Sequence, residues 1–402
     1  MATVVLVGTL DTKGAEYAWL RDRVRELGCD TVLVDVGVGP SDVEADVSAE
    51  DVAQAGGASL PALREAGDRG AAVAAMGEGA AVVLAALDRV DAVLAVGGSG
   101  GSSIAARAVR DLPIGLPKLI VSTMASGDVA PYVGAKDVTI TYSVVDIAGV
   151  NRLSRLILGN AAAAAAGMAK AHAVPEPAVD ERPLVGASMF GVTTPAVDAA
   201  RERLGELGYE VLVFHATGAG GRALEGLVES GLLAGVLDLT TTELADDLVG
   251  GVLSAGPDRL TAAGRHGVPQ VVAPGALDMV NFGPRATVPE RFGERLLYVH
   301  NPTVTLMRTT AEEMGELGRR MASKLAAATG PTVLFVPLKG VSALDAPGMP
   351  FHDPVADVAC FMALEEAAES TETEMLDLHI NDPEFGRAMA DRLHRLISEG
   401  AR

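Results

Sequence analysis

Cysteine and aromatic residues are scarce in this 402-residue chain, and each shortage excludes something. The two cysteines, Cys29 and Cys360, are too few for a disulfide framework or a cysteine-based metal cluster, which fits a reducing cytoplasm. Aromatic residues make up only 3% of the chain, so the cores must consist mainly of Val, Leu and Ala. No apolar run approaches the ~20 residues of a membrane span, and the N-terminus lacks a signal peptide's basic region. We therefore expect a cytoplasmic protein without a membrane association.

Positive charge is scarce as well, because 32 Lys and Arg residues face 53 Asp and Glu residues, for a net charge of −21. Polyanions such as DNA and RNA bind through neutralisation of their phosphates, so general nucleic-acid binding is not expected. An anionic membrane surface is disfavoured for the same reason. A small anionic ligand must instead be held locally, by backbone amides and a few cations.

Short apolar runs alternate with helical patterns along the whole chain, and hydrophobic residues at 49% are sufficient for buried cores. Strands that alternate with helices predict crossover connections and mostly parallel sheets. The expected strands are 3–7, 31–36, 92–96, 119–122 and 138–144, then 184–189, 210–215, 236–239, 270–273 and 333–336. The fold class is therefore α/β, with two Rossmann-like doubly wound subdomains.

A proline-rich segment divides the two halves of the chain. Three prolines lie within ten residues between Val174 and Pro183, a composition typical of a linker. We therefore predict an N-terminal domain at 1–174, a linker at 175–183 and a C-terminal domain at 184–402.

Two glycine-rich turns follow expected strands in the first half. Residues 8–14 read GTLDTKG, and residues 97–103 read GGSGGSS. Both turns should lie at the carboxyl edge of a parallel sheet, where open α/β sheets bind their ligands. Amides at a helix N-terminus and a lysine, Lys13, suit a phosphate, and Asp11 suits Mg²⁺. The first turn is not a Walker A sequence, and its alternative interpretation is an ordinary capped turn between a strand and a helix. The alternative for the second turn is a flexible surface loop.

A third turn, residues 122–128 with the sequence STMASGD, follows another expected strand and would add hydroxyls and a carboxylate to the same edge. Its residue types are also common in ordinary turns. The candidate cofactor-binding residues are Gly8, Thr9, Asp11, Thr12, Lys13, Gly97, Gly98, Ser99, Gly100, Gly101, Ser102, Ser122, Thr123, Ser126, Gly127 and Asp128.

The second half contains three further polar groupings. His215 and Arg222 flank a glycine-rich turn after an expected strand, which suggests an acid/base group beside an anion clamp. Asp238 and Glu243 lie five residues apart and could bind a metal or shift each other's pKa, unless they only cap a helix. Residues 300–309 gather polar side chains in an otherwise apolar half. The histidines lack zinc-site spacing, so a zinc site is not expected and the metal ligands stay open.

Several of these strings resemble the UPF0261 family, also called the Tm-1-like ATP-binding proteins. The resemblance spans nearly the whole chain, in order, with one mild departure: the family pattern continues as Gly-Thr after Ser99, where this chain has Gly100, Gly101 and Ser102. The matching strings are GTLDTKG at 8–14, GGSGG at 97–101, LPIGLPK at 112–118, VSTMASGD at 121–128, YSVVDIAG at 142–149, MFGVTTP at 189–195, FHATG at 214–218, DLTTTE at 238–243 and HNPTVTLMRT at 300–309.

The resemblance implies two Rossmann-like subdomains, ATP binding by the N-terminal one, and a homodimer. The main hypothesis is an ATP- and Mg²⁺-dependent enzyme that acts on a small carboxylic or sugar acid in an interdomain cleft. Two alternatives stay open: a nucleotide-binding regulatory or interaction module without turnover, and an ATP-independent acid/base enzyme with retro-aldol-like chemistry. The candidate catalytic residues are His215, Arg222, Glu243, His300 and Arg308.

Overall fold

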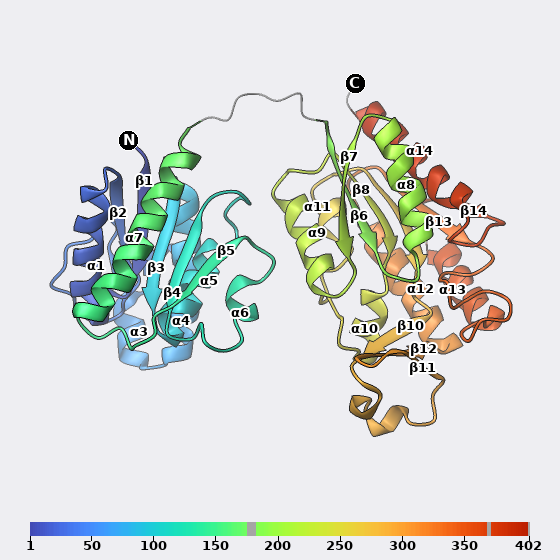
Figure 1. Ribbon diagram of the computed structural model, residues 1–402, viewed down its shortest axis with the longest axis horizontal. Helices are drawn as coiled ribbons and strands as arrows, with labels where there is room; N and C mark the ends of the chain where they lie inside the picture. Colours follow the sequence, from blue (N-terminus) through green and yellow to red (C-terminus); the bar gives the residue numbers. More distant parts are fainter. Residues whose placement is uncertain (175–181, 368–370, 401–402) are drawn as a thin grey trace. The chain divides into compact units, whose positions relative to one another are not determined.

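The computed structural model describes residues 1–174, 182–367 and 371–400. Its contacts divide the chain into two compact units, Met1–Ala178 and Val179–Arg402. The proline-rich segment 175–183 lies almost entirely outside the described residues. Each unit is an α/β unit built on a parallel sheet, which confirms the predicted fold class (Figure 1).

The first unit has a five-stranded sheet in the order β2-β1-β3-β4-β5, and every pair of neighbours is parallel. Its central strands are apolar and buried on both faces, as expected where helices cover both sides. The strands are β1 (Thr3–Gly8), β2 (Asp30–Asp35), β3 (Ala92–Gly97), β4 (Lys118–Ser122) and β5 (Val138–Tyr142).

Helices cover both faces of this sheet (Figure 1). One face packs against α1 (Leu10–Glu26) and α7 (Arg152–His172). The other face packs against α2 (Ala49–Ala55), α4 (Arg69–Ala86) and α5 (Ser99–Val109). Two short helices complete the unit, α3 (Leu60–Ala66) and α6 (Ala130–Val133).

Helix α4 is the one helix among the described residues that has the length and apolar composition of a membrane span. It lies in the core of the first unit, where Met76, Ala80 and Leu84 are buried against the sheet and α5. Packing within the unit accounts for its composition.

The second unit has a six-stranded parallel sheet in the order β14-β13-β9-β8-β6-β7. A small antiparallel sheet, β10-β12-β11, extends it and was not predicted from the sequence. The strands are β6 (Leu184–Met189), β7 (Glu210–His215), β8 (Gly235–Thr240), β9 (Gln270–Gly275), β10 (Met279–Phe282), β11 (Leu297–Asn301), β12 (Val304–Arg308), β13 (Thr332–Pro337) and β14 (Glu372–Leu376).

Helices again cover both faces of the larger sheet (Figure 1). One face packs against α8 (Thr194–Glu206) and α14 (Pro383–Gly400). The helices that pack against the other face are α9 (Ala219–Glu229), α10 (Glu243–Val249), α11 (Ala262–Arg265), α12 (Ala311–Ala326) and α13 (Pro354–Ala367). Two single turns of 3₁₀ helix, Arg285–Thr287 and Glu290–Phe292, precede β11.

Each parallel sheet has a point where successive strands are added on opposite sides. In the first unit this switch lies between β1 and β3, because β2 is on the outer side of β1. In the second unit it lies between β6 and β8, with β7 on the outer side of β6. Ligands of open α/β sheets bind at such switch points, outside the carboxyl ends of the strands.

Candidate functional site

A cavity of about 590 Å³ lies at the switch point of the first unit. Residues that follow β1, β2 and β3 line it, together with residues of α3 and α4. The two glycine-rich turns predicted to meet at this edge do meet there: the first contributes Thr9, Asp11, Thr12 and Lys13, and the second contributes residues 98–101. This volume falls within the range typical of small-molecule sites.

Tyr17 of α1 joins the carboxyl ends of β1 and β3. Its buried hydroxyl donates to the carbonyl of Val7, at 2.5 Å, and accepts from the amide of Val96, at 2.7 Å. Burial raises the pKa of the Tyr17 phenol well above its ordinary value, so it stays protonated. Gly8 is required beside it, since an added Cβ would lie 2.0 Å from the Tyr17 ring. The phenol thus satisfies backbone groups that the diverging strands leave unpaired.

The second turn leads directly into α5, whose N-terminus faces the cavity. Gly98 is the N-cap and provides no side chain to cap the first amides of the helix. Those amides have no intrahelical acceptor and carry the positive end of the helix dipole, so an anion is their natural partner. Gly97 permits the tight turn, because an added Cβ would lie 2.9 Å from the Cα of Gly101.

Three cations line the cavity, and sequence reasoning found only Lys13. The Lys13 ammonium donates to the carbonyl of Ile147 at 2.7 Å. The backbone of Lys13 departs from helical geometry and interrupts α1 at this residue. Arg64 donates to the carbonyls of Val38 and Gly39, which fixes the loop after β2. Arg69 begins α4 and approaches the N-terminus of α5, since an added Cβ at Gly100 would lie 3.4 Å from its Nη2.

Asp11 is a candidate contact for a metal that accompanies a phosphate. Its Oδ2 accepts from the amide of Gly39 at 2.8 Å, whereas the buried Oδ1 makes no hydrogen bond. Gly37 and Gly39 are needed here, because a Cβ at either would lie within 3 Å of this carboxylate. Asp35, at the end of β2, accepts from the amides of Leu10 and Gly37, and burial raises its pKa. Asp35 therefore joins the start of α1, next to Asp11, to the loop that follows β2.

Not every predicted cofactor-binding residue lines this cavity. Ser102 and Ser122 are buried and share a hydrogen bond of 2.6 Å between their hydroxyls, which joins α5 to the end of β4. Asp128 accepts from the amide of Ala130, the first residue of the short helix α6. The predicted residues outside the lining are Gly8, Gly97, Ser102, Ser122, Thr123, Ser126, Gly127 and Asp128.

Apolar side chains also line the cavity, and they were not anticipated from the sequence. These side chains come from the loop after β2 and from the helices α3, α4 and α5. They include Val36, Val38, Leu63, Val73 and Met76. The cavity thus combines amides and cations with apolar side chains against which a ring can pack.

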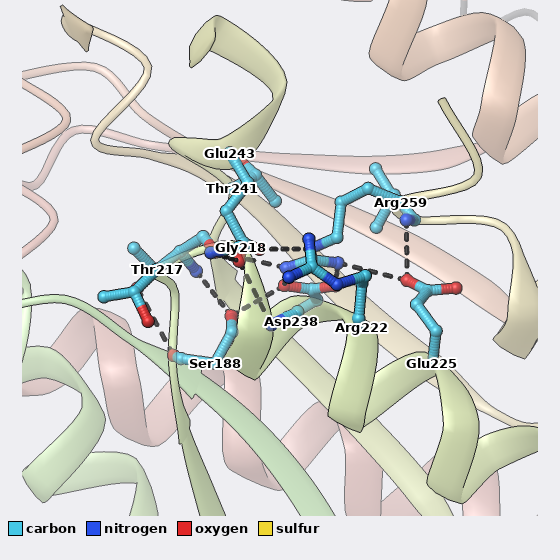
Figure 2. A network of polar contacts seen from close by, with 12 residues as sticks. Ser188, Thr217, Gly218, Arg222, Glu225, Asp238, Thr241, Glu243 and Arg259 are labelled. Atoms are coloured by element: carbon cyan, nitrogen blue, oxygen red, sulfur yellow. Dashed lines mark hydrogen bonds and ion pairs between the residues drawn. The ribbon is translucent and has the colours of Figure 1, made fainter. Parts of the chain in front are cut away.

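In the second unit, Asp238 and Glu243 lie on either side of Arg259 (Figure 2). Arg259 Nε donates to Glu243 Oε2 at 2.6 Å, and Nη2 donates to Asp238 Oδ1 at 2.7 Å. Burial lowers the pKa of Arg259, but the carboxylates around it outweigh this effect and hold that pKa well above its ordinary value. Glu243 Oε1 accepts from the amides of Gly218 and Gly221. Among the described residues, no group of three or more His, Cys, Asp or Glu residues is arranged to hold a metal ion.

The other predicted catalytic residues lie on different elements of the second unit. His215, at the end of β7, is exposed and contacts the ring of Phe190 edge-on. Arg222, on α9, is also exposed and donates to the carbonyl of Ser254 at 3.1 Å. His300 is exposed on β11, whereas Arg308 is buried at the end of β12. The structure thus places Glu243 against the turn between His215 and Arg222, and places His300 and Arg308 on the small sheet.

Comparison with known families agrees with this two-unit architecture. Residues 2–174 match the N-terminal domain, and residues 182–397 the C-terminal domain, of "Uncharacterised protein family (UPF0261)". The chain belongs to the UPF0261 family. A UPF0261 protein of Clostridium tetani is 51% identical over 402 residues, which cover 98% of this chain and 99% of that protein. A UPF0261 protein of Rhizobium meliloti is also 51% identical, over 391 residues that cover 96% of this chain and 97% of that protein.

A plant protein is also similar to this UPF0261 member. The ToMV resistance protein Tm-1(GCR237) of Solanum lycopersicum is 41% identical over 417 residues, which cover 96% of this chain and 55% of the tomato protein. Among solved structures, a Streptomyces glycosyltransferase, SsfS6, has a TM-score of 0.22 at 15% identity and covers 99% of this chain. That match covers 100% of the glycosyltransferase chain, and at such a TM-score nothing about ligands follows from it.

Proposed function

We propose that the first unit binds ATP, with its phosphates at the N-terminus of α5. The uncapped amides of this helix carry the proposal, because they face a cavity of nucleotide size and have no acceptor within the helix. Arg69 and Lys13 line the same end and can supply the charge that a triphosphate requires. The resemblance to the Tm-1-like ATP-binding family favours ATP over other nucleotides.

The remaining parts of the cavity suit the rest of this ligand. The apolar side chains of Val38, Leu63 and Met76 offer a surface on which an adenine ring can pack. Asp11, whose Oδ1 lacks a hydrogen bond, would hold a Mg²⁺ ion that accompanies the phosphates. Magnesium would there neutralise phosphate charge.

The test is nucleotide binding by the full chain, measured by calorimetry with ATP and Mg²⁺. Arg69→Ala and Lys13→Ala should each weaken ATP binding by about 10- to 100-fold, the effect of losing one charge-assisted contact. Arg110→Ala is the matched control, because Arg110 is exposed at the opposite end of α5 and should leave the affinity unchanged. If the Arg69→Ala variant binds ATP with the same affinity as the parent protein, the phosphate site is wrongly placed.

Turnover of ATP on a small carboxylic or sugar acid is the second part of the proposal. His215 and Arg222 support it, because both are exposed near a glycine-rich turn and can meet an acid. ATP and Mg²⁺ incubated with a panel of such acids should release ADP, AMP or pyrophosphate, and His215→Ala should abolish the stimulation. If no acid stimulates release, a binding module without turnover is favoured. The homodimer and the cytoplasmic location stay predictions.

A further inference from the structure

A second cavity, of about 460 Å³, lies in the second unit and plays no part in the proposed nucleotide site. It opens where β13 and β14 end, beside the first turns of α13. Most of its wall is apolar and includes Leu338, Pro347, Val358 and Phe361. Its carboxylate is Asp357, in the first turn of α13.

Behind this wall, three buried carboxyl groups share one guanidinium. Asp357 Oδ1 accepts from Arg308 Nη2 at 2.8 Å, and the same carboxylate lines the cavity. Asp345 and Asp278 are fully buried, and Oδ1 of each makes no hydrogen bond. Asp345 Oδ1 is directed toward Arg308 Nη2, at 4.0 Å, and toward His352 Nδ1, at 3.8 Å. The cluster therefore has more carboxylate oxygens than donors to satisfy them.

The protonation of the cluster reflects this shortage of positive charge. Burial and the charge of Asp345 raise the pKa of Asp357 to about 7, and Arg308 offsets this only in part. The same causes raise the pKa of Asp278 to about 7. Burial and Asp357 also raise the pKa of the Cys360 thiol to about 12. A cation that entered the cavity would meet Asp357, whose negative charge Arg308 offsets only in part because Asp345 and Asp278 lie close to the same guanidinium.

The neighbouring cations and amides are already engaged, which disfavours an anionic ligand. Arg308 also donates to the carbonyl of Phe351 and to the hydroxyl of Thr309. Lys339, at the rim, donates to the carboxylate of Asp377 at 2.9 Å. The first amides of α13 donate to Asp353.

The two histidines that line the cavity differ in the hydrogen bonds that their ring nitrogens make. His379 Nδ1 accepts from the amide of Asn381, and its Nε2 lies 3.0 Å from the carbonyl of Ser342, so both ring nitrogens are engaged. His352 is partly exposed, and no hydrogen bond of its Nε2 is present among the described residues. A neutral His352 can therefore accept a hydrogen bond from a ligand in the cavity.

We propose that this cavity binds a small primary amine, whose ammonium group pairs with Asp357 and whose apolar part packs against Val358 and Phe361. Asp357 and His352 are the acceptors, and the apolar wall selects an amine with a hydrocarbon or aromatic portion. Binding favours ionised Asp357 and therefore strengthens as the pH rises toward neutrality. This inference does not depend on the nucleotide site in the first unit.

The experiment compares three probes of similar shape: benzylamine, benzyl alcohol and benzoate. Each is titrated into the full chain without nucleotide, and binding is followed by ligand-observed NMR. Benzylamine should bind about tenfold more tightly than benzyl alcohol, and benzoate should not bind. Equal binding of the amine and the alcohol, or no binding of benzylamine, overturns the proposal.

Asp357→Asn removes the charge and keeps an oxygen that can accept from Arg308. It should lower benzylamine affinity about tenfold, to that of benzyl alcohol. The matched control is Asp258→Asn, because Asp258 is 80% exposed and lies outside the lining. It should leave the affinity within about twofold.

A measurement on the parent protein tests the proposal even if the Asp357→Asn variant fails to fold. Calorimetry near neutral pH, in buffers of different ionisation enthalpy, should show proton release when benzylamine binds and none with benzyl alcohol. An amine that binds with no proton release, and equally well to the Asp357→Asn variant, would exclude Asp357 as its partner.

Discussion

Arg259 and Asp238 form a buried ion pair in the second unit, in which Nη2 donates to Oδ1 at 2.7 Å and neither side chain is more than 2% exposed. The pair joins β8 to the loop before α11, and Glu243 extends it to the turn after β7 (Figure 2). Asp238 also accepts from the hydroxyl of Ser188 at 2.6 Å. The contacts of Asp238 and Glu243 thus organise the carboxyl ends of three strands.

Replacing Arg259 by Met should strongly destabilise the second unit. The substitution leaves Asp238 and Glu243 buried without their cation, and removing one partner of a buried ion pair costs about 3–5 kcal/mol. Urea unfolding of the full chain should show the loss. Arg265→Met is the control, since Arg265 is 53% exposed and its ion pairs are long, so it should cost less than ~1 kcal/mol. Equal midpoints for the two variants would contradict this account.

Two glycines in consecutive helices should respond to alanine in opposite ways. An added Cβ at Gly221 would lie 2.1 Å from Glu243 Oε2, which Arg259 holds in place, so Gly221→Ala should cost about 2 kcal/mol or more. No atom lies within 4 Å of a Cβ at Gly205 in α8, and Gly205→Ala should gain ~0.5 kcal/mol through helix propensity. Thermal unfolding of both variants checks the difference, and a tolerated Gly221→Ala would argue against a rigid Glu243.

Asp246 should make the second unit less stable as the pH rises. Burial raises its pKa to about 7, although hydrogen bonds from Asn281 oppose the shift. A raised pKa in the folded state stabilises the protein fully below the unfolded value, near pH 4, and this contribution is lost as the pH rises through about 7. The loss amounts to at most about 4 kcal/mol.

The Asp246→Asn variant should lack this part of the pH dependence, which urea unfolding at several pH values would measure. Asn281 Oδ1 makes no hydrogen bond, so a flipped Asn281 amide can accept from the new side chain. The control is Asp258→Asn, because Asp258 is 80% exposed. A parent and an Asp246→Asn variant with the same pH profile would show that Asp246 titrates normally.

Tyr17→Phe should affect both stability and the proposed nucleotide site. The missing hydroxyl leaves the amide of Val96 and the carbonyl of Val7 buried without this partner, at a cost of about 1–3 kcal/mol. Because these strands lead into the two glycine-rich turns, ATP affinity should also fall. Tyr142→Phe serves as the control, since Tyr142 is exposed. An unchanged unfolding midpoint for Tyr17→Phe would mean that water replaces the hydroxyl.

Several features of the fold and of the candidate site could be read from the sequence. Apolar runs of strand length between helical patterns predicted ten strands of the parallel sheets, because burial on both faces requires such runs. The turns at 8–14 and 97–103 were predicted to meet, since carboxyl ends of parallel strands share one edge. The small antiparallel sheet was missed because its segment 300–309 was interpreted as a grouping of polar side chains and not as a strand.

The sequence by itself determined the two α/β units, the family and the glycine-rich edge of the first sheet, because all three depend on local patterns and their order. Only the tertiary structure decided which charges meet. Arg69 reaches the cavity because α4 packs beside α5, and Arg259 neutralises Asp238 because a distant loop folds over β8. Such partners are separated along the chain, and their pairing follows from how helices and loops pack on the sheet.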